Sequence, residues 1–273
     1  MRRLAFFCVY LYCYAKLPNM KTIRLFVAAA AAILLLTGCA RELKTATASG
    51  AGSVPLTEDS EIGLSYDYSI EYVLGGIPKA AREKINAAIV RNLLFDDAQE
   101  DGDVPTACRR WAGDCEAAYR ADTEQLADSV DEDAAWILNW SYSAGGAFTT
   151  ACKARNWQSY RSSAAEYTGG AHGMYGETWY VFDLETGETV READFLDPAC
   201  TEELAELMTG RILTVLEEAD AADALLGNPY PNGNFSVDDA GVTWHFNPYE
   251  IAPYAMGVLE ASLRWEELKP FLK

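Results

Sequence analysis

Histidine is scarce in this chain, and its scarcity limits the chemistry that the protein can perform. Only His172 and His245 occur among the 273 residues, and 73 positions separate them. The cysteines form no CxxC pair and no Cys/His combination with the spacing of a zinc site. We therefore predict neither a metal site nor a bound cofactor.

The sequence also lacks the short motifs of two common enzyme classes. It contains no GxSxG elbow, which positions the nucleophile of many serine hydrolases. Its glycine-rich stretch is not followed by Gly-Lys-Ser or Gly-Lys-Thr, which a phosphate-binding loop requires. We expect no catalytic residues, with one alternative kept open: a cell-wall hydrolase that uses His172 and Glu250 as its acid and base.

Basic residues are few as well, with 22 Lys and Arg against 41 Asp and Glu, for a formal charge of −19. Residues 1–38 hold five of the basic residues and no acidic one, so the rest of the chain has 22 − 5 = 17 basic residues and a charge of 17 − 41 = −24. Such a surface repels nucleic acids and attracts basic proteins and cations. Nucleic acid is thus excluded as a partner, although the same charge also suits simple solubility.

The N-terminal region has the pattern of an export signal. A positive segment, Met20–Arg24, precedes the apolar run Leu25–Leu36. This run is too short to span a membrane as a helix, and the pattern predicts a secretory signal peptide over residues 1–38. Because residues 1–19 contain an apolar stretch of their own, we expect the true start at Met20.

The end of that signal, Leu36-Thr37-Gly38-Cys39, resembles the bacterial lipobox. The resemblance implies cleavage before Cys39, acylation of its sulfur, and a lipid anchor in a membrane. The expected location is the bacterial cell envelope, outside the cytoplasm.

Four further cysteines suit an oxidising compartment. Three pairings are open to an even set of four, and we expect 108–115 and 152–200, that is Cys108 with Cys115 and Cys152 with Cys200. On an unbroken helix the first two would lie about 10 Å apart along the axis, which is too far for a bond. This pairing therefore requires a break at Gly113-Asp114.

Composition and periodicity predict an α+β fold with mostly antiparallel sheets and helices packed on one face. Residues 39–60 are rich in Ala, Thr, Ser and Gly and predict a flexible tether. We expect two sub-domains after it, 61–165 and 166–273. The predicted helices begin at Pro78, Pro105 and Thr201. The first has an apolar stripe of Ile85, Ile89 and Leu93, and the third one of Leu204, Leu207, Met208, Ile212, Val215 and Leu216. The predicted strands are Leu64–Val73, Trp136–Tyr142, Phe148–Ala154, Trp157–Tyr167, Thr178–Phe182, Phe235–Val237, Val242–Phe246 and Val258–Trp265.

Two segments stand out as a candidate binding site. Tyr167–Asp183 holds four glycines around His172, and is either a tight corner between strands or a nest of amides that binds a carboxylate or carbonyl. Asn247–Gly257 has two prolines that fix its backbone, and its carboxylate is either a buried strut or part of a cleft floor. The candidate ligand-binding residues of the two segments are Tyr167, His172, Tyr175, Tyr180, Tyr249, Glu250 and Tyr254.

Three motifs in order resemble one known domain: Tyr167–Gly173, Phe182–Gly187 and Phe246–Gly257, with Trp265–Lys269 at the end. That domain is the extracytoplasmic domain of unknown function of RsiV-type anti-sigma factors, which sense lysozyme. Residues 61–165 resemble the companion domain that also accompanies the catalytic domain of PdaC-type peptidoglycan deacetylases. The resemblance implies a binding module and transfers no catalytic residues. Because the family pairs Tyr167–Asp183 with Asn247–Gly257 in one domain, we expect these segments to pack together around His172, Tyr249 and Glu250.

The chain departs from both families in its other parts. A lipobox takes the place of the cytoplasmic segment and spanning helix of an anti-sigma factor, and we recognise no deacetylase domain. We therefore expect a non-enzymatic, lipid-anchored envelope protein that binds a lysozyme-like muramidase or a cell-wall glycan. A structural envelope lipoprotein without a small ligand is the alternative.

Overall fold

A computed structural model describes residues 43–58, 60–94, 102–124 and 132–273. The signal peptide expected over residues 1–38, the start at Met20 and the lipidation of Cys39 lie outside these ranges. Within them, no helix is long and apolar enough to cross a membrane.

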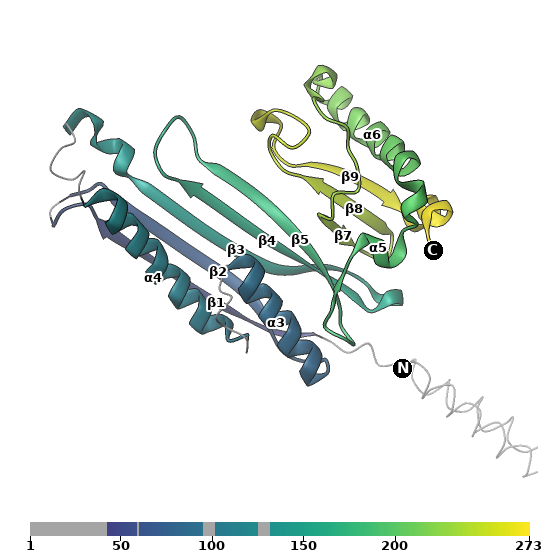
Figure 1. The fold of residues 1–273 in the computed structure, drawn as a ribbon, viewed down its shortest axis with the longest axis horizontal. Helices are drawn as coiled ribbons and strands as arrows, with labels where there is room; N and C mark the ends of the chain where they lie inside the picture. Colours follow the sequence, from purple (N-terminus) through teal and green to yellow (C-terminus); the bar gives the residue numbers. More distant parts are fainter. Residues whose placement is uncertain (1–42, 59, 95–101, 125–131) are drawn as a thin grey trace, which may run out of the picture. The chain divides into compact units, whose positions relative to one another are not determined.

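Six strands form the larger of two sheets (Figure 1). All neighbouring strands are antiparallel except β2 and β3, which are parallel because two helices connect them. The expected α+β fold with mostly antiparallel sheets is therefore confirmed. In sheet order the strands are β1 (Lys44–Pro55), β2 (Gly63–Gly75), β3 (Trp140–Cys152), β4 (Trp157–Tyr167), β5 (Met174–Asp183) and β6 (Thr189–Val190).

Strand β1 corrects the expectation of a tether over residues 39–60, since residues 44–55 pair with β2 along their whole length. The small residues of β1 serve packing. A Cβ on Gly50 or Gly52 would overlap the ring of Tyr68 or Tyr66, which lie over these glycines from β2. The small residues of β1 are typical of a flexible linker, but here they leave room for the large side chains of the neighbouring strand β2.

Helices α3 (Lys79–Leu93) and α4 (Val104–Thr123) cover one face of β1 and β2 (Figure 1). The stripe of apolar residues predicted for α3, including Ile85 and Ile89, is buried against the sheet. Asp103 caps α4 by accepting a hydrogen bond from the backbone N–H of Thr106 at 3.3 Å. The two helices and the sheet thus enclose one apolar core.

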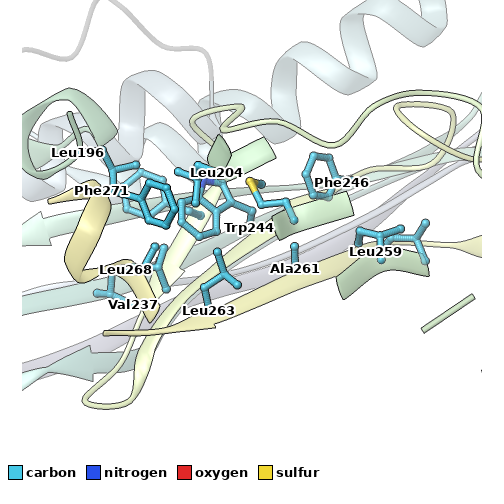
Figure 2. Packing of buried hydrophobic residues seen from close by; sticks show 14 of the residues in the cluster. Leu196, Leu204, Val237, Trp244, Phe246, Leu259, Ala261, Leu263, Leu268 and Phe271 are labelled. Atoms are coloured by element: carbon cyan, nitrogen blue, oxygen red, sulfur yellow. The ribbon is translucent and has the colours of Figure 1, made fainter. Parts of the chain in front are cut away.

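The smaller sheet is built of three antiparallel strands that pack on helix α6 (Figure 2). The apolar residues of α6 recur at helical spacing, as predicted, and Leu204, Met208, Ile212 and Leu216 are buried. Leu207 and Val215, which the same prediction placed on the stripe, are instead exposed. The helices and strands of this part are α5 (Glu192–Phe195), α6 (Thr201–Glu218), β7 (Phe235–Val237), β8 (Gly241–Phe246), β9 (Leu259–Arg264) and α7 (Trp265–Leu268).

Short 3-10 turns occur in both parts of the fold. They are η2 (Glu132–Leu138), η3 (Lys153–Arg155), η4 (Pro198–Cys200), η5 (Ala222–Ala224), η6 (Tyr254–Met256) and η7 (Lys269–Phe271).

The larger sheet continues across the boundary that we expected between residues 165 and 166. Strands β4 and β5 pair from Trp157 with Asp183 to Glu166 with Met174, on both sides of that boundary. Residues 168–173 are therefore a hairpin turn within one sheet, which was the simpler of the two interpretations.

The hydroxyl of Ser159 joins the two sheets. It donates to the carbonyl of Val237 at 3.0 Å and accepts from the N–H of the same residue at 2.8 Å.

The expected disulfides are wrong, because all four described cysteines are free. Cys108 and Cys115 lie on α4, which runs without a break through Gly113 and Asp114. Seven residues of helix separate their Cα atoms by about 10 Å, beyond the reach of a disulfide. Burial raises the pKa of both thiols to about 11, so they stay protonated. Cys152 and Cys200 both contact the core of the smaller sheet without bonding to each other.

Candidate functional site

The glycine-rich hairpin between β4 and β5 holds the first half of the site. Gly169 and Gly170 have φ values of +94° and +97°, which side chains rarely tolerate. A Cβ on Gly169 would also come within 2.7 Å of the carbonyl oxygen of Ile137. These glycines fold the chain back closely enough to place His172 and Tyr175 beside the second segment.

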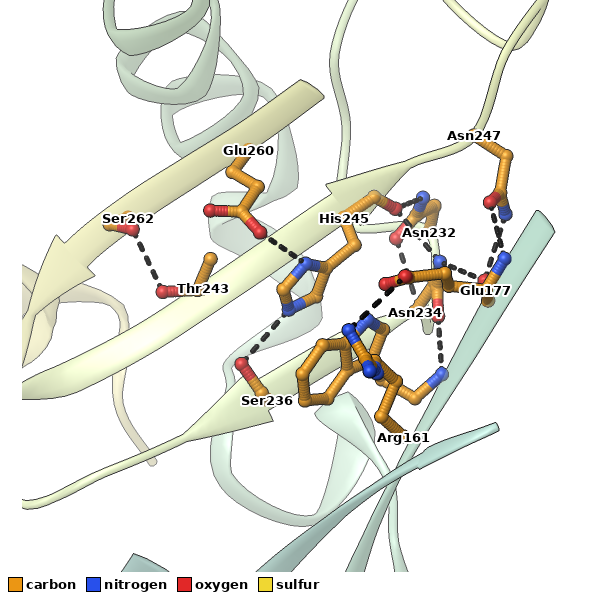
Figure 3. A network of polar contacts seen from close by, with 11 residues as sticks. Arg161, Glu177, Asn232, Asn234, Ser236, Thr243, His245, Asn247, Glu260 and Ser262 are labelled. Carbon is orange, nitrogen blue, oxygen red and sulfur yellow. Dashed lines mark hydrogen bonds and ion pairs between the residues drawn. The ribbon is translucent and has the colours of Figure 1, made fainter. Parts of the chain in front are cut away.

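Two asparagine side chains hold that second segment against the free edge of β5 (Figure 3). Asn247 accepts from the N–H of Glu177 at 2.7 Å and donates to its carbonyl at 2.9 Å. Asn234 accepts from the N–H of Trp179 at 2.7 Å and donates to the same carbonyl of Glu177 at 3.2 Å. The amides take the place of a neighbouring strand, satisfy the exposed edge, and fix the start of Asn247–Gly257.

Tyr254 is the centre of the contact between the two segments. Its ring stacks on His172 with centroids 4.6 Å apart, and lies 5.5 Å from the rings of both Tyr175 and Tyr249. Its hydroxyl donates to the carbonyl of Gly173 at 3.0 Å. The segments therefore pack together as expected, although around Tyr254 instead of the predicted trio of His172, Tyr249 and Glu250.

Tyr249 is displayed to solvent by a strained loop. Its φ is +70°, and 58% of its surface is exposed. Such a conformation costs about 1–3 kcal/mol for a residue other than glycine and often marks a functional site. Glu250 stabilises the loop by accepting from Asn232 Nδ2 at 2.7 Å and from the N–H of Asn247 at 2.9 Å. Of the two roles that we weighed for Glu250, its hydrogen bonds are those of a strut, although the residue is exposed and not buried as expected.

A groove of about 540 Å³ lies beside Tyr254, on the face of the larger sheet that α3 and α4 leave uncovered. Tyr66 and Tyr68 of β2 point to α4, where they contact Trp111, so the alternating residues Ser65 and Asp67 point the other way. We name this hollow the tyrosine groove. Its wall is Tyr167, Tyr175 and Tyr254, and its floor is Ala51, Ser65, Asp67, Ser141, Ser143 and Ala165.

The hydroxyls of two wall residues are already engaged. Tyr167 donates to the carbonyl of Gly170 at 3.0 Å, and Tyr254 donates to Gly173. These bonds fix the rings before any ligand arrives, which lowers the entropic cost of binding. On the floor, Ser143 Oγ donates to Asp67 Oδ2 at 3.1 Å.

Of the seven predicted residues, Tyr167, Tyr175 and Tyr254 line the groove, while His172, Tyr249 and Glu250 lie in or beside the contact around Tyr254. The seventh lies apart from both. Tyr180 lies half-buried on the helix side of β5, where its ring stacks on Phe182. Tyr175 and Tyr180 are five positions apart on one strand, so their side chains must point to opposite faces. The floor residues of β2 and β3 were missed by sequence reasoning, because nothing in the sequence indicates that these two strands are neighbours.

Another constellation that the sequence did not reveal crosses the smaller sheet (Figure 3). Ser236 Oγ lies 2.9 Å from His245 Nε2, and His245 Nδ1 lies 3.1 Å from Glu260 Oε1. The order serine, histidine, carboxylate is that of a hydrolase triad. The hydrogen bond from His245 lowers the pKa of Glu260.

Burial separates the serine and the histidine of this constellation from solvent, whereas the side chain of Glu260 is 56% exposed. Ser236 is 8% exposed and His245 2% exposed, and the ring of Trp179 stacks flat on the imidazole at 4.2 Å. None of the three residues lines the groove. A reacting carbonyl would have to displace Trp179, so the arrangement stabilises the three strands and their contact with β5.

Comparisons with known proteins concern the fold and a family without an assigned activity. Residues 190–266 match the family described as "Protein of unknown function (DUF3298)", a range that contains α6, the smaller sheet and Asn247–Gly257. No curated protein matches the sequence. The expectation of a domain of unknown function in this half is confirmed, while the RsiV-type and PdaC-type resemblances stay predictions.

Two solved structures resemble the larger part of the chain. A member of the DUF3298 family from Bacteroides fragilis NCTC 9343 aligns with a TM-score of 0.77 at 20% identity, over 86% of this chain and 95% of its own. A DUF3298 family protein from Pseudomonas aeruginosa PAO1 aligns with a TM-score of 0.60 at 17% identity, over 85% and 95%. Because both alignments extend well beyond residues 190–266, the larger sheet belongs to the shared fold.

Proposed function

We propose that this protein is a non-enzymatic binding module of the bacterial cell envelope, and that the tyrosine groove binds a cell-wall glycan. One observation carries the proposal: three tyrosines, two of them with rings held by hydroxyl hydrogen bonds, stand over a floor of serine hydroxyls and a carboxylate. The groove volume of about 540 Å³ lies within the range of small-molecule sites.

The chemistry of the groove suits a sugar chain. Aromatic rings offer flat apolar surfaces for the C–H faces of a pyranose, and they lose little entropy on binding because they have few rotatable bonds. Ser65, Ser141 and Asp67 offer donors and acceptors for sugar hydroxyls. The resemblance to RsiV-type and PdaC-type proteins, which act at the cell wall, supports the same assignment.

The contacts favour binding over hydrolysis by the predicted acid–base pair. His172 is stacked on Tyr254, and its Nδ1 lies 2.9 Å from the carbonyl oxygen of Gly173. Glu250 is occupied by Asn232 and Asn247. Neither residue is among those that line the groove.

The glycan assignment is tested by titrating the purified protein with N-acetylglucosamine–N-acetylmuramic acid oligosaccharides in a calorimeter. Tyr175→Ala removes an exposed wall residue and is expected to weaken binding about tenfold or more, the usual effect at a binding hot spot. Tyr230→Ala is the matched control, since Tyr230 is 52% exposed and does not line the groove. Absence of binding, or equal losses in both variants, would refute the assignment.

A second partner is favoured by the acidic composition of residues 39–273, whose formal charge of 17 − 41 = −24 would attract a basic protein such as a lysozyme-like muramidase. Titration with lysozyme, beside an inert basic protein of equal charge, separates specific recognition from general attraction. Equal affinities that vanish together in moderate salt would exclude a specific muramidase partner.

The anchor is part of the proposal. A Cys39→Ser variant is expected to lose incorporation of a clickable palmitate analogue and to leave the membrane fraction. Labelling that persists in the variant would contradict lipidation at this residue.

A further inference from the structure

We propose that the ligand of the tyrosine groove carries a protonated amine that Asp67 binds, so that the glycan it selects contains glucosamine with a free amino group. The inference rests on the proposed glycan site and adds its specificity.

The first observation is the charge of the groove. Among its lining residues Asp67 and Glu166 are acidic and none is Lys, Arg or His. Glu166 precedes Tyr167 on β4, so strand alternation directs its side chain to the helix side, whereas Asp67 shares the face of the floor. One carboxylate therefore dominates the electrostatics of the floor.

The second observation is that Asp67 has no structural partner of opposite charge in the part of the chain that the structure describes. Among the described residues, the one hydrogen bond that its carboxylate accepts comes from Ser143. Glu71 lies on the same face of β2, and both of its oxygens are used, by Thr45 Oγ1 at 2.5 Å and by the N–H of Phe148 at 2.9 Å. Arg161, on the same sheet face, is paired with Glu177 at 3.4 Å. Glu71 thus has a role in the fold that Asp67 lacks.

The third observation is the aromatic wall. An ammonium group near the face of a tyrosine is attracted by the negative potential of the ring. The hydroxyls of Tyr167 and Tyr254 are bound to backbone carbonyls, so their rings stay in place when a cation enters. A carboxylate on one side and aromatic rings on the other form a site for an organic cation.

A free amino sugar meets these features better than its alternatives. An N-acetylated sugar is neutral at nitrogen and would leave Asp67 without a counter-charge. A lysine side chain would supply the charge but would leave the hydroxyls of Ser65 and Ser141 without a partner from the ligand. The formal charge of 17 − 41 = −24 over residues 39–273 adds a long-range preference for the cationic ligand.

The test uses two oligosaccharides that differ only in acetylation: the β-1,4-linked tetramer of glucosamine and that of N-acetylglucosamine. They are titrated at about pH 5.5, well below the usual range of aliphatic amines. We expect the wild type to bind the glucosamine tetramer about tenfold more tightly, a preference that added salt reduces because the pair is exposed.

Two variants locate the effect. Asp67→Asn keeps the shape of the side chain and is expected to bind both tetramers equally. Asp223→Asn makes the same change in charge at an exposed residue that does not line the groove, and is expected to keep the preference. Unchanged far-UV circular dichroism and thermal unfolding of Asp67→Asn show that it is folded.

The outcomes separate the two proposals. Equal binding of both tetramers by the wild type, or a preference that survives in Asp67→Asn, overturns the amine while the glycan site stands. Binding of neither tetramer overturns both. Binding of tetralysine through Asp67, without either sugar, assigns the cation to a polypeptide and overturns the amino sugar.

Discussion

At the scale of single residues, His245 shows how a catalytic-looking arrangement can stabilise a fold. Its two ring nitrogens contact Ser236 and Glu260, and its face is covered by Trp179. Every polar atom of the imidazole is therefore satisfied although the residue is 2% exposed. Among the described residues the indole N–H of Trp179 has no partner, which indicates that stacking, and not a side-chain hydrogen bond, fixes the ring.

This network makes stability depend on pH through Glu260. Because its pKa is lowered in the folded protein, its contribution is present above the ordinary glutamate pKa of about 4.3 and is lost as the pH falls through the lower folded value. Glu260→Gln is expected to destabilise the protein at pH 7 by about 0.2–1 kcal/mol, a small effect because the carboxylate is partly exposed. Urea unfolding at pH 7, 5 and 3 measures it.

The difference between wild type and Glu260→Gln should disappear at the lowest pH. Glu206→Gln, at an exposed position on α6, is the control and should show little difference at any pH. A destabilisation of Glu260→Gln that stays constant down to pH 3 would contradict the role of its charge.

At the scale of elements, β1 is a strand whose identity depends on its neighbour. Gly50 and Gly52 lie under tyrosine rings, while Ser49 alternates with them and is exposed on the opposite face. The strand can therefore accept a large side chain on one face only.

Gly50→Val is expected to destabilise the protein by about 1–3 kcal/mol, because the new side chain must displace the ring of Tyr68. Ser49→Val introduces the same residue on the open face and should be nearly neutral. Thermal unfolding compares the two. Equal and negligible effects would be those of a tether and would refute the strand.

The elements also show which features a sequence discloses. The stripes of α3 and α6 were predictable, since apolar residues three and four apart define one helix face. Strand β1 was not, because its small residues have meaning only beneath Tyr66 and Tyr68. Apolar periodicity predicts which residues of a segment face a core. It does not identify a strand whose small residues accommodate the side chains of a neighbouring strand.

The site was predictable to a similar degree. The meeting of the hairpin with Asn247–Gly257 could be anticipated, because the resemblance to the RsiV-type domain places both segments in one domain. The wrong assignment of Tyr180 could have been avoided by counting strand alternation from Tyr175. Asp67 and Ser143 could not be found, since they meet through a parallel pairing across two intervening helices.

At the scale of the whole molecule, the two sheets are coupled by buried hydrogen bonds. Ser159 is fully buried and bonds both backbone groups of Val237. Thr150 Oγ1 donates to the same carbonyl at 2.8 Å. We therefore expect residues 43–273 to unfold as one unit, without a separate transition for 61–165.

Ser159→Ala removes the partner of the buried N–H of Val237 and should lower stability by about 1–3 kcal/mol. Ser163→Ala, four residues along the same face of β4, is the control and should change it little. Denaturation followed by tryptophan fluorescence and by far-UV circular dichroism should give coincident curves for all three proteins. Two separate transitions in the wild type would contradict the coupling.

The early start of β1 limits the reach of the protein. If Cys39 carries the lipid, five peptide units separate it from Lys44, a span of at most about 17 Å. This connection would be shorter than the long strands of the larger sheet, so it would keep the folded part close to the membrane. The protein would then bind the glycan strands that lie nearest the bilayer surface.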